Sequence, residues 1–240
     1  MKPDLNLVSQ EFVLVQAWKK TVSQIRYQNW FSDTLELDRV AADLPDFLGR
    51  LSERLSSGNY QTAPLALVPA PKSQKWDIRN GKWGPASREK AKVRPLAHVA
   101  LADQVAATAV MLCLSDRVES AQGDPRSDYW SRDDRKQVVS LGNRLFCDTG
   151  EKSKQLVHRW GSSKLYRAYF QDYRTFLNRP EAAAEQIQNN EREVFIVQTD
   201  LKQFYDRVTP QALHAKINGL QRGDEDAGFY ELASRVLNWD

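Results

Sequence analysis

One carboxylate in this chain lies where a metal-dependent reaction could use it. Asp200 directly follows residues 193–199, EVFIVQT, an almost continuously apolar run of β-branched and aromatic residues that predicts a buried strand. A carboxylate at the end of such a strand is held rigidly and opens onto a cleft. Because Mg²⁺ prefers carboxylate oxygens and keeps substrate phosphates in its coordination shell, Asp200 suits metal-dependent phosphoryl transfer. The alternative is a helix N-cap, since a helical segment could begin just after Asp200.

A strongly basic stretch runs from residue 72 to residue 94, although the net charge of the whole chain is only +3. The stretch contains eight Lys and Arg residues against two acidic residues, and it includes Trp76 and Trp83. Cations interleaved with aromatic rings suit a polyanion with stackable bases, which favours nucleic acid as the partner. A solvated loop with two locally packed tryptophans is the alternative interpretation.

Two helices are expected in the first 63 residues. Apolar residues between Phe12 and Ile25 recur at intervals of three and four and predict the first helix. The second is expected from Asp43, with Pro45 in its first turn and Gly58 as its stop signal. The apolar faces of these helices pack either on the rest of the chain or on a second copy of it, so a homo-oligomer stays open.

Two short apolar runs, residues 64–69 and 92–99, flank the basic stretch. Together they predict a long β-hairpin, whose connecting loop is longer than hairpin loops usually are. Residues 101–118 predict a helix with an apolar stripe and close-packed alanines. The residues at 121–135 are rich in Gly, Pro, Ser and Asp and predict a loop.

Aromatic residues are concentrated at positions 155–176, among them Tyr169, Tyr173 and Phe176. We interpret this segment as a helix that faces the core, with a base-stacking platform as the alternative. Residues 180–190, PEAAAEQIQNN, predict a further helix because most of them are good helix formers.

Residues 199–208, TDLKQFYDRV, resemble the first catalytic motif of reverse transcriptases. In that motif an apolar strand ends in Asp, followed by an aliphatic residue, a Lys-like position and an aromatic pair. The resemblance implies that Asp200 binds catalytic Mg²⁺ and that the backbone carbonyl of Leu201 is a second, weaker ligand. It also implies that Tyr205 lies beneath the sugar of the incoming nucleotide, where its ring leaves no room for a 2′-hydroxyl. An ordinary core aromatic is the alternative for Tyr205.

A second segment is similar to the fingers of bacterial and group II intron-type reverse transcriptases. It starts at Lys92-Val-Arg-Pro-Leu, continues through Asp103-Gln-Val-Ala-Ala and ends at Glu119. In those enzymes a basic strand runs into a helix that closes with an apolar–Glu pair. Lys92 and Arg94 alternate onto one face of the strand, so the resemblance implies that they grip a triphosphate or a template phosphate. A charged guard on an exposed strand edge is the alternative.

Residues 140–145, SLGNRL, resemble the short Ser-x-Gly-x-Arg segment between fingers and palm. The resemblance implies that Arg144 contacts a phosphate of the template or of the incoming nucleotide. A plain loop with one arginine is the alternative. The segment between Asp116 and Ser140 is longer than the compact intron-type pattern, which favours the divergent bacterial branch that includes abortive-infection and phage-defence enzymes.

The resemblance covers roughly residues 64–209 and implies an α+β, helix-rich fold. It would comprise the fingers and the start of the palm of a right-hand polymerase, with a long basic β-hairpin. We expect an N-terminal helical extension at 1–63, fingers at 64–190 and the start of the palm at 191–240. The enzyme would add deoxynucleotides from dNTPs to a nucleic-acid or protein hydroxyl primer, with Mg²⁺ as cofactor and RNA or DNA as template-primer.

The family's second catalytic motif, an aromatic residue, any residue and then two aspartates, does not occur in these 240 residues. Asp133-Asp134 precedes Asp200 and follows Arg132, so it receives no catalytic role. We therefore expect an incomplete palm that a longer polypeptide or a partner completes, and no polymerisation by this chain alone. The competing hypothesis is a non-catalytic polymerase relic that binds RNA through its basic hairpin.

The composition offers little for other functional classes. No window approaches the roughly 18 unbroken apolar residues of a membrane span, so no membrane contact is expected. The first residues lack the apolar core of a signal peptide. Cys113 and Cys147 form no disulfide framework, which favours a reducing, cytoplasmic setting.

Overall fold

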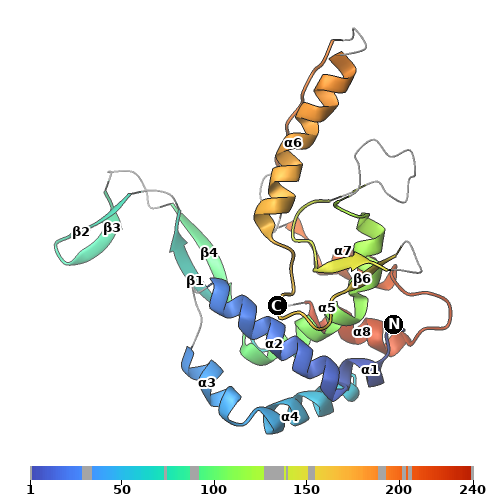
Figure 1. Ribbon diagram of the computed structural model, residues 1–240. Coiled ribbons are helices and arrows are strands. Elements are labelled where there is room, and N and C mark those ends of the chain that lie inside the picture. Colours follow the sequence, from blue (N-terminus) through green and yellow to red (C-terminus); the bar gives the residue numbers. More distant parts are fainter. Residues whose placement is uncertain are drawn as a thin grey trace.

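The computed structural model describes residues 2–28, 34–72, 75–86, 92–126, 138, 140–150, 155–188, 193–201, 204 and 207–238 (Figure 1). Within these ranges the fold is α+β, as expected, with a helical core and three small two-stranded antiparallel sheets. The helices are α1 (Leu5–Ser9), α2 (Glu11–Gln28), α3 (Thr34–Ala42), α4 (Leu44–Ser56), α5 (Leu101–Gln122), α6 (Tyr169–Gln188), α7 (Pro210–Asn218) and α8 (Ala227–Val236). The strands pair as β1 (Ala66–Pro71) with β4 (Val93–His98), β2 (Trp76–Arg79) with β3 (Lys82–Pro85), and β5 (Cys147–Thr149) with β6 (Leu156–His158).

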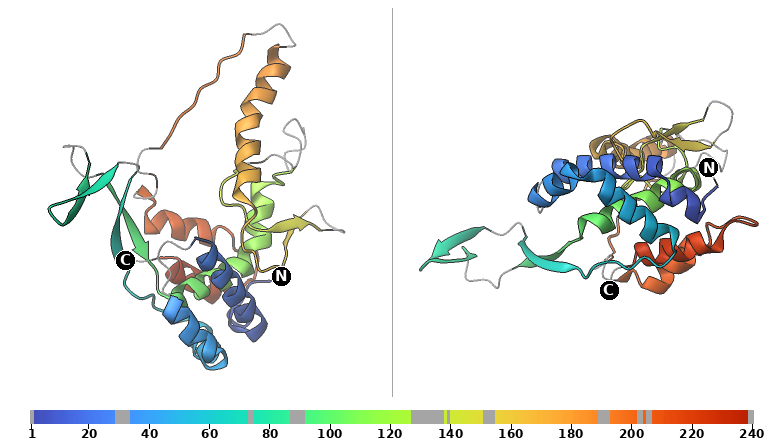
Figure 2. Two further views of the ribbon diagram at one scale, coloured as in Figure 1. Left: turned by 60° about the vertical axis from the view of Figure 1, so that its left-hand side comes forward. Right: turned by 90° about the horizontal axis from the view of Figure 1, so that it is seen from below.

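The central helix is α5, which is buried on nearly every side. α2, α4 and α8 pack against it (Figure 2). Apolar side chains from the N-terminal helices, α5, the β5–β6 sheet and α8 form a single hydrophobic cluster. Each of the three expected segments, 1–63, 64–190 and 191–240, contributes residues to this cluster.

The two helices expected near the N-terminus are confirmed as α2 and α4. α4 begins after Asp43 with Pro45 in its first turn, and the chain leaves it at Gly58, whose φ of +70° is left-handed. The buried face of α2 differs slightly from the expected one, because Val13 is buried whereas Phe12 is exposed. Both helices bury their apolar faces in the common core. Of the two expected arrangements, they therefore pack on the rest of the chain and not on a second copy.

The expected long β-hairpin is confirmed. β1 and β4 are antiparallel, with Ala66 opposite His98. The basic stretch between them is not a loop, however, because β2 and β3 form a second hairpin beyond the first (Figure 1). Its turn is Asn80-Gly81, and both residues have the positive φ of a type I′ turn, 52° and 72°. The dipeptide Asn-Gly is the sequence signal that predicts this turn.

A buried carboxylate attaches the chain before β1 to α5. Asp103 accepts a hydrogen bond from the Tyr60 hydroxyl at 2.7 Å and another from the Ala63 backbone N–H at 2.8 Å. Burial and the bond to Asp103 raise the pKa of Tyr60, so its hydroxyl remains a donor. Because Ala63 lies shortly before β1, Asp103 positions the base of the hairpin on the first turn of α5.

A polar network joins α5 to the C-terminal helices. Arg117 donates to both carboxylate oxygens of Glu225 at 2.6 Å and to the Tyr230 hydroxyl oxygen at 2.6 Å. The hydrogen bonds from Arg117 lower the pKa of Glu225 to about 2, so this pair stays charged at every ordinary pH. The network holds the segment between α7 and α8 against α5.

The aromatic-rich segment differs from the expectation. Residues 155–176 do not form one core-facing helix, because β6 occupies 156–158 and α6 begins only at Tyr169. α6 projects from the body and continues through Pro180, so the helix expected at 180–190 is its second half (Figures 1 and 2). The rings of Tyr173 and Phe176 are exposed on it. Aromatic residues have the same helical spacing whether their face packs on a core or is exposed to solvent. The spacing therefore predicted the helix but not its exposure.

The loop expected at 121–135 begins at Gly123, where α5 ends, and residues 127–137 lie outside the described residues. Both Cys113 and Cys147 are free and buried. In the part of the chain that the structure describes, no helix combines the length and the apolar character needed to cross a membrane.

Candidate functional site

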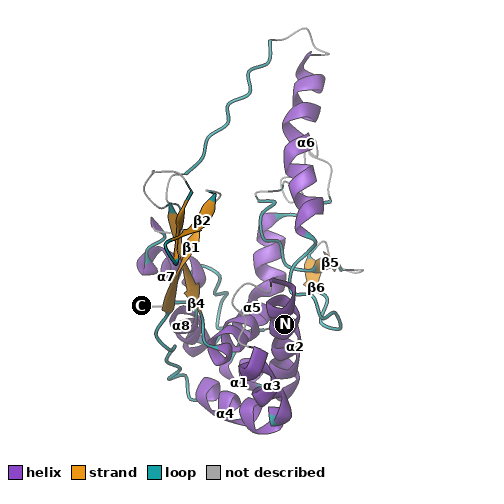
Figure 3. Cartoon of the chain, turned by 90° about the vertical axis from the view of Figure 1, so that its left-hand side faces the viewer, coloured by secondary structure: helices purple, strands orange, loops and turns teal. Residues whose placement is uncertain are grey.

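Asp200 lies in an exposed, extended part of the chain. Residues 193–201 form no strand, and Phe195 and Val197 are 83% and 84% exposed. The buried strand expected at 193–199 is therefore wrong. A strand is stable when a neighbour pairs with its backbone and one face is packed, and no described strand pairs with this segment. Figures 2 and 3 show the segment leaving the far end of α6 and running back toward the body.

The N-cap alternative for Asp200 concerns a helix starting at residues 202 and 203, which lie outside the described residues. The next helix in the described residues is α7, and its cap is Thr209, whose hydroxyl oxygen accepts from the Ala212 N–H at 3.2 Å. Asp200 and Leu201 are both exposed, so the carboxylate is accessible to a ligand. Tyr205, the expected sugar-contacting residue, lies outside the described residues.

The residues expected to hold Mg²⁺ fit that role in part. The carboxylate of Asp200 and the neighbouring carbonyl of Leu201 are oxygen ligands of the kind that Mg²⁺ accepts. A two-metal site needs further carboxylates. The described part of the chain contains no group of three or more His, Cys, Asp or Glu side chains placed to share a metal. Within the described residues, Asp200 thus supplies one carboxylate to such a site.

Lys92 and Arg94 are exposed on the β4 side of the long hairpin. Arg94 is opposite Ala70 in β1, and the Lys92 carbonyl accepts a hydrogen bond from the Lys72 backbone N–H at 2.9 Å. This ladder fixes the strand, and the two-residue spacing puts both cations on one face. From β4 the chain passes directly into α5, in the order that the motif predicts. The hairpin therefore presents two cations on a face that an anion can reach.

Arg144 has a different role from the expected one. Its side chain is fully buried, and Nε donates to Glu119 Oε2 at 2.8 Å while Nη1 donates to the Ser140 carbonyl at 2.7 Å. The other Glu119 oxygen accepts from the Leu145 backbone N–H at 2.8 Å. A buried guanidinium is stable only beside an anion, which here is the Glu119 carboxylate. These bonds direct the guanidinium into the protein, where a phosphate cannot reach it. The phosphate contact expected for Arg144 is therefore corrected: the residue joins the end of α5 to residues 140–145.

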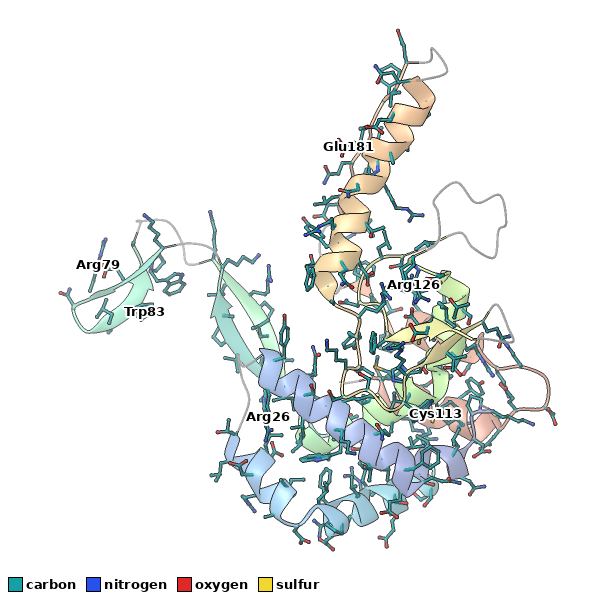
Figure 4. All side chains as sticks on the ribbon, in the orientation of Figure 1. Arg26, Arg79, Trp83, Cys113, Arg126 and Glu181 are labelled. Atoms are coloured by element: carbon teal, nitrogen blue, oxygen red, sulfur yellow. The ribbon has the colours of Figure 1, made fainter. Side chains whose placement is uncertain are left out.

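The β2–β3 hairpin adds a surface to which the motif resemblance assigns no role. Ile78 and Trp83 are cross-strand partners, 63% and 60% exposed, and Trp76 stacks on Trp83 with ring centroids 6.4 Å apart. Arg79 and Lys82 are exposed on either side of the turn. Figure 4 shows Arg79 and Trp83 on this β2–β3 hairpin, the outer hairpin, which lies away from the helical body. Exposed aromatic and apolar side chains beside cations are typical of surfaces that bind single-stranded nucleic acid.

A pocket of about 590 Å³ lies between α7 and α8, and its walls include His214, Glu231 and Arg235. None of the expected site residues lines it. Arg235 donates to the Gly58 carbonyl at 2.8 Å and so ties α8 to the end of α4. The pocket is therefore separate from the hairpin and from Asp200.

Comparison with protein-family models, with curated proteins and with solved structures gave no match to this chain. The motif residues and their surroundings in the fold are therefore the basis for a proposed function. Of these residues, Lys92, Arg94 and Asp200 are accessible to a ligand, whereas Arg144 is enclosed.

Proposed function

We propose that this chain forms the fingers and the start of the palm of a reverse transcriptase. The proposal is based on the way three segments pack together: the β1–β4 hairpin, α5 and residues 140–145. The β1–β4 hairpin presents Lys92 and Arg94 and runs directly into the buried α5. The end of α5 is joined through Glu119 to residues 140–145. Segments that each resemble the same family thus pack as one unit, in the order that the resemblance implies.

In the proposed reaction, Lys92 and Arg94 bind the triphosphate of an incoming dNTP, Arg94 as a bidentate fork. Asp200 and the Leu201 carbonyl hold Mg²⁺, which when bound supplies charge stabilisation for the attacking and leaving oxygens. With RNA or DNA as the template, a hydroxyl oxygen of a nucleic-acid or protein primer attacks the α-phosphorus of the dNTP and loses its proton to water. A phosphodiester bond forms, the bond between the α-phosphorus and the oxygen that bridges to the β-phosphate breaks, and pyrophosphate leaves. Tyr205 selects deoxynucleotides by occupying the space of a 2′-hydroxyl.

The exposed residues at 193–197 fit this proposal. Their apolar side chains are those that a palm strand buries once neighbouring strands pair with it. The family's second carboxylate motif would lie on such strands, and these 240 residues lack it, so we infer that the chain by itself does not polymerise. The buried, free thiols of Cys113 and Cys147 suit the cytoplasm. The long segment after Asp116 supports a place among antiphage-defence enzymes.

The substitution Asp200→Asn tests the proposed function in the complete product of the gene that encodes this chain. Asparagine keeps the size of the side chain but removes its charge. We expect dNTP incorporation on a primed RNA template to fall at least about a hundredfold. Because Asp200 is exposed, the thermal unfolding midpoint should not change. Glu193→Gln, at a nearby exposed carboxylate, is the matched control and should keep full incorporation. Incorporation at the wild-type rate by the Asp200→Asn protein would refute the proposal.

The outer hairpin favours a second candidate function, which is RNA binding without catalysis. Replacing both Arg79 and Lys82 with Glu reverses their charges. The double variant is expected to bind single-stranded RNA at least about tenfold more weakly, and its binding should depend less on salt concentration. Fluorescence anisotropy at several salt concentrations measures both effects. Arg50→Glu, on the exposed surface of α4, is the control and should bind normally, as should Asp200→Asn. RNA affinity that is indifferent to Arg79 and Lys82 would exclude this candidate.

A further inference from the structure

α6 has an apolar face that the rest of the described fold leaves open. On this face, Tyr169, Tyr173, Phe176 and Leu177 are between 45% and 65% exposed. The rings of Tyr169 and Tyr173 stack with centroids 5.3 Å apart, and those of Tyr173 and Phe176 are 6.3 Å apart. Figures 1 and 3 show α6 projecting from the body. A contiguous apolar surface of this kind marks an interaction site.

The size of the side chains changes along this face. Helical periodicity continues the aromatic row through Pro180, Ala184 and Ile187. The first half of the face is therefore bulky, and the second half is mostly small. Such a helix is complementary to an antiparallel copy of itself, because the bulky half of each helix then packs on the small half of the other.

The charges along one edge of this face fit the same arrangement. Arg174 and Glu181 are two turns apart on that edge, and both are exposed; Figure 4 labels Glu181. In an antiparallel pair of identical helices the same edges meet. When the two helices cross between residues 177 and 178, Arg174 of each copy faces Glu181 of the other. The symmetric pair thus makes this contact twice.

We propose that α6 is a self-association surface, through which two copies of this chain pair in antiparallel orientation. A second copy is favoured over nucleic acid because the accessible charges of α6 balance: Glu181 and Glu185 offset its two arginines, and Asp172 is buried against Arg167. A polyanion therefore meets no net positive charge on this helix. This surface is separate from the long hairpin and from Asp200, so the proposal does not depend on the proposed polymerase activity.

Sedimentation velocity over a wide range of protein concentration tests this pairing, and the wild-type chain should form a dimer. Arg174→Glu and Glu181→Arg should each weaken dimerisation at least about tenfold, because each places like charges at both symmetric contacts. The double variant should recover wild-type dimerisation. An equimolar mixture of the two single variants should recover it as well, since opposite charges meet at both contacts of the mixed dimer. Gln171→Glu changes a charge on the opposite face of α6 and should dimerise like wild type.

A wild-type chain that stays monomeric at every concentration would overturn the pairing. Single variants that dimerise as tightly as wild type would do the same, because the dimer would then form through another surface. A mixture that remains monomeric would show that Arg174 and Glu181 do not face each other. A monomeric chain whose RNA affinity falls in Tyr173→Ala would assign this face to nucleic acid and reject the second copy.

Discussion

Replacing Glu119 with glutamine is expected to lower the free energy of unfolding by about 3–5 kcal/mol. The substitution keeps the shape of the side chain but removes the charge that faces the Arg144 guanidinium at 2.8 Å. Both side chains are almost completely buried, so water cannot replace the lost carboxylate. Arg144 would then carry a buried charge without its counterion. Urea unfolding followed by circular dichroism measures the loss.

The matched control for this ion pair is Asp46→Asn, because Asp46 pairs with Arg50 on the exposed surface of α4. We expect that change to cost no more than about 1 kcal/mol, since water and salt screen exposed pairs. The double variant Glu119→Gln/Arg144→Met should recover part of the loss, because it removes the buried charge together with its partner. Equal losses for Glu119→Gln and Asp46→Asn would contradict the structural role of the buried pair.

Because of this ion pair, a loss of activity in an Arg144 variant would not identify Arg144 as a ligand of phosphate. A substitution of Arg144 would impair activity by loosening the junction between α5 and residues 140–145, without the removal of any phosphate contact. Asp200→Asn changes an exposed side chain, so its effect on incorporation is expected with an unchanged unfolding midpoint. Measuring dNTP incorporation and the unfolding midpoint of each variant therefore distinguishes the loss of a catalytic group from the loss of stability.

The elements that form through local interactions could be predicted from the sequence. The apolar spacing of α2, α4 and α5 is a property of each helix alone, and the two short runs of the long hairpin are neighbours across one connection. The β2–β3 hairpin was expected as a loop, although its turn carries a local sequence signal. Two consecutive residues with positive φ are the requirement of a type I′ turn, and Asn80-Gly81 meets it.

The expectations that proved wrong concern what surrounds a residue. Residues 193–199 have the composition of a buried strand, but composition cannot supply the neighbour with which a strand pairs. The spacing of Tyr169 and Tyr173 is helical whether their face meets a core or solvent. Arg144 follows a glycine-containing segment, as a phosphate ligand often does, yet its role is set by Glu119, 25 positions earlier in the chain. Each of these outcomes depends on long-range contacts that local patterns do not contain.

Asp103→Ala is expected to destabilise the chain by about 3 kcal/mol and to loosen the base of the hairpin that presents Arg94. The substitution removes the carboxylate from two donors, the buried Tyr60 hydroxyl and the Ala63 backbone N–H. A buried donor without an acceptor costs roughly 1–3 kcal/mol, so losing the acceptor of both exceeds the effect of most single substitutions. Urea unfolding gives the size of the effect, and hydrogen exchange of the β1 amides gives its location.

The control is Tyr60→Phe, which removes one donor and leaves Asp103 bonded to the Ala63 N–H. It should cost about 1 kcal/mol and leave exchange in β1 unchanged, because the backbone bond persists. Unchanged exchange in Asp103→Ala as well would mean that packing alone holds the base of the hairpin. Faster exchange only in Asp103→Ala would show that a carboxylate in the first turn of α5 sets the hairpin's attachment. The position of Lys92 and Arg94, and with it the proposed grip on a triphosphate, would then depend on a residue that no ligand touches.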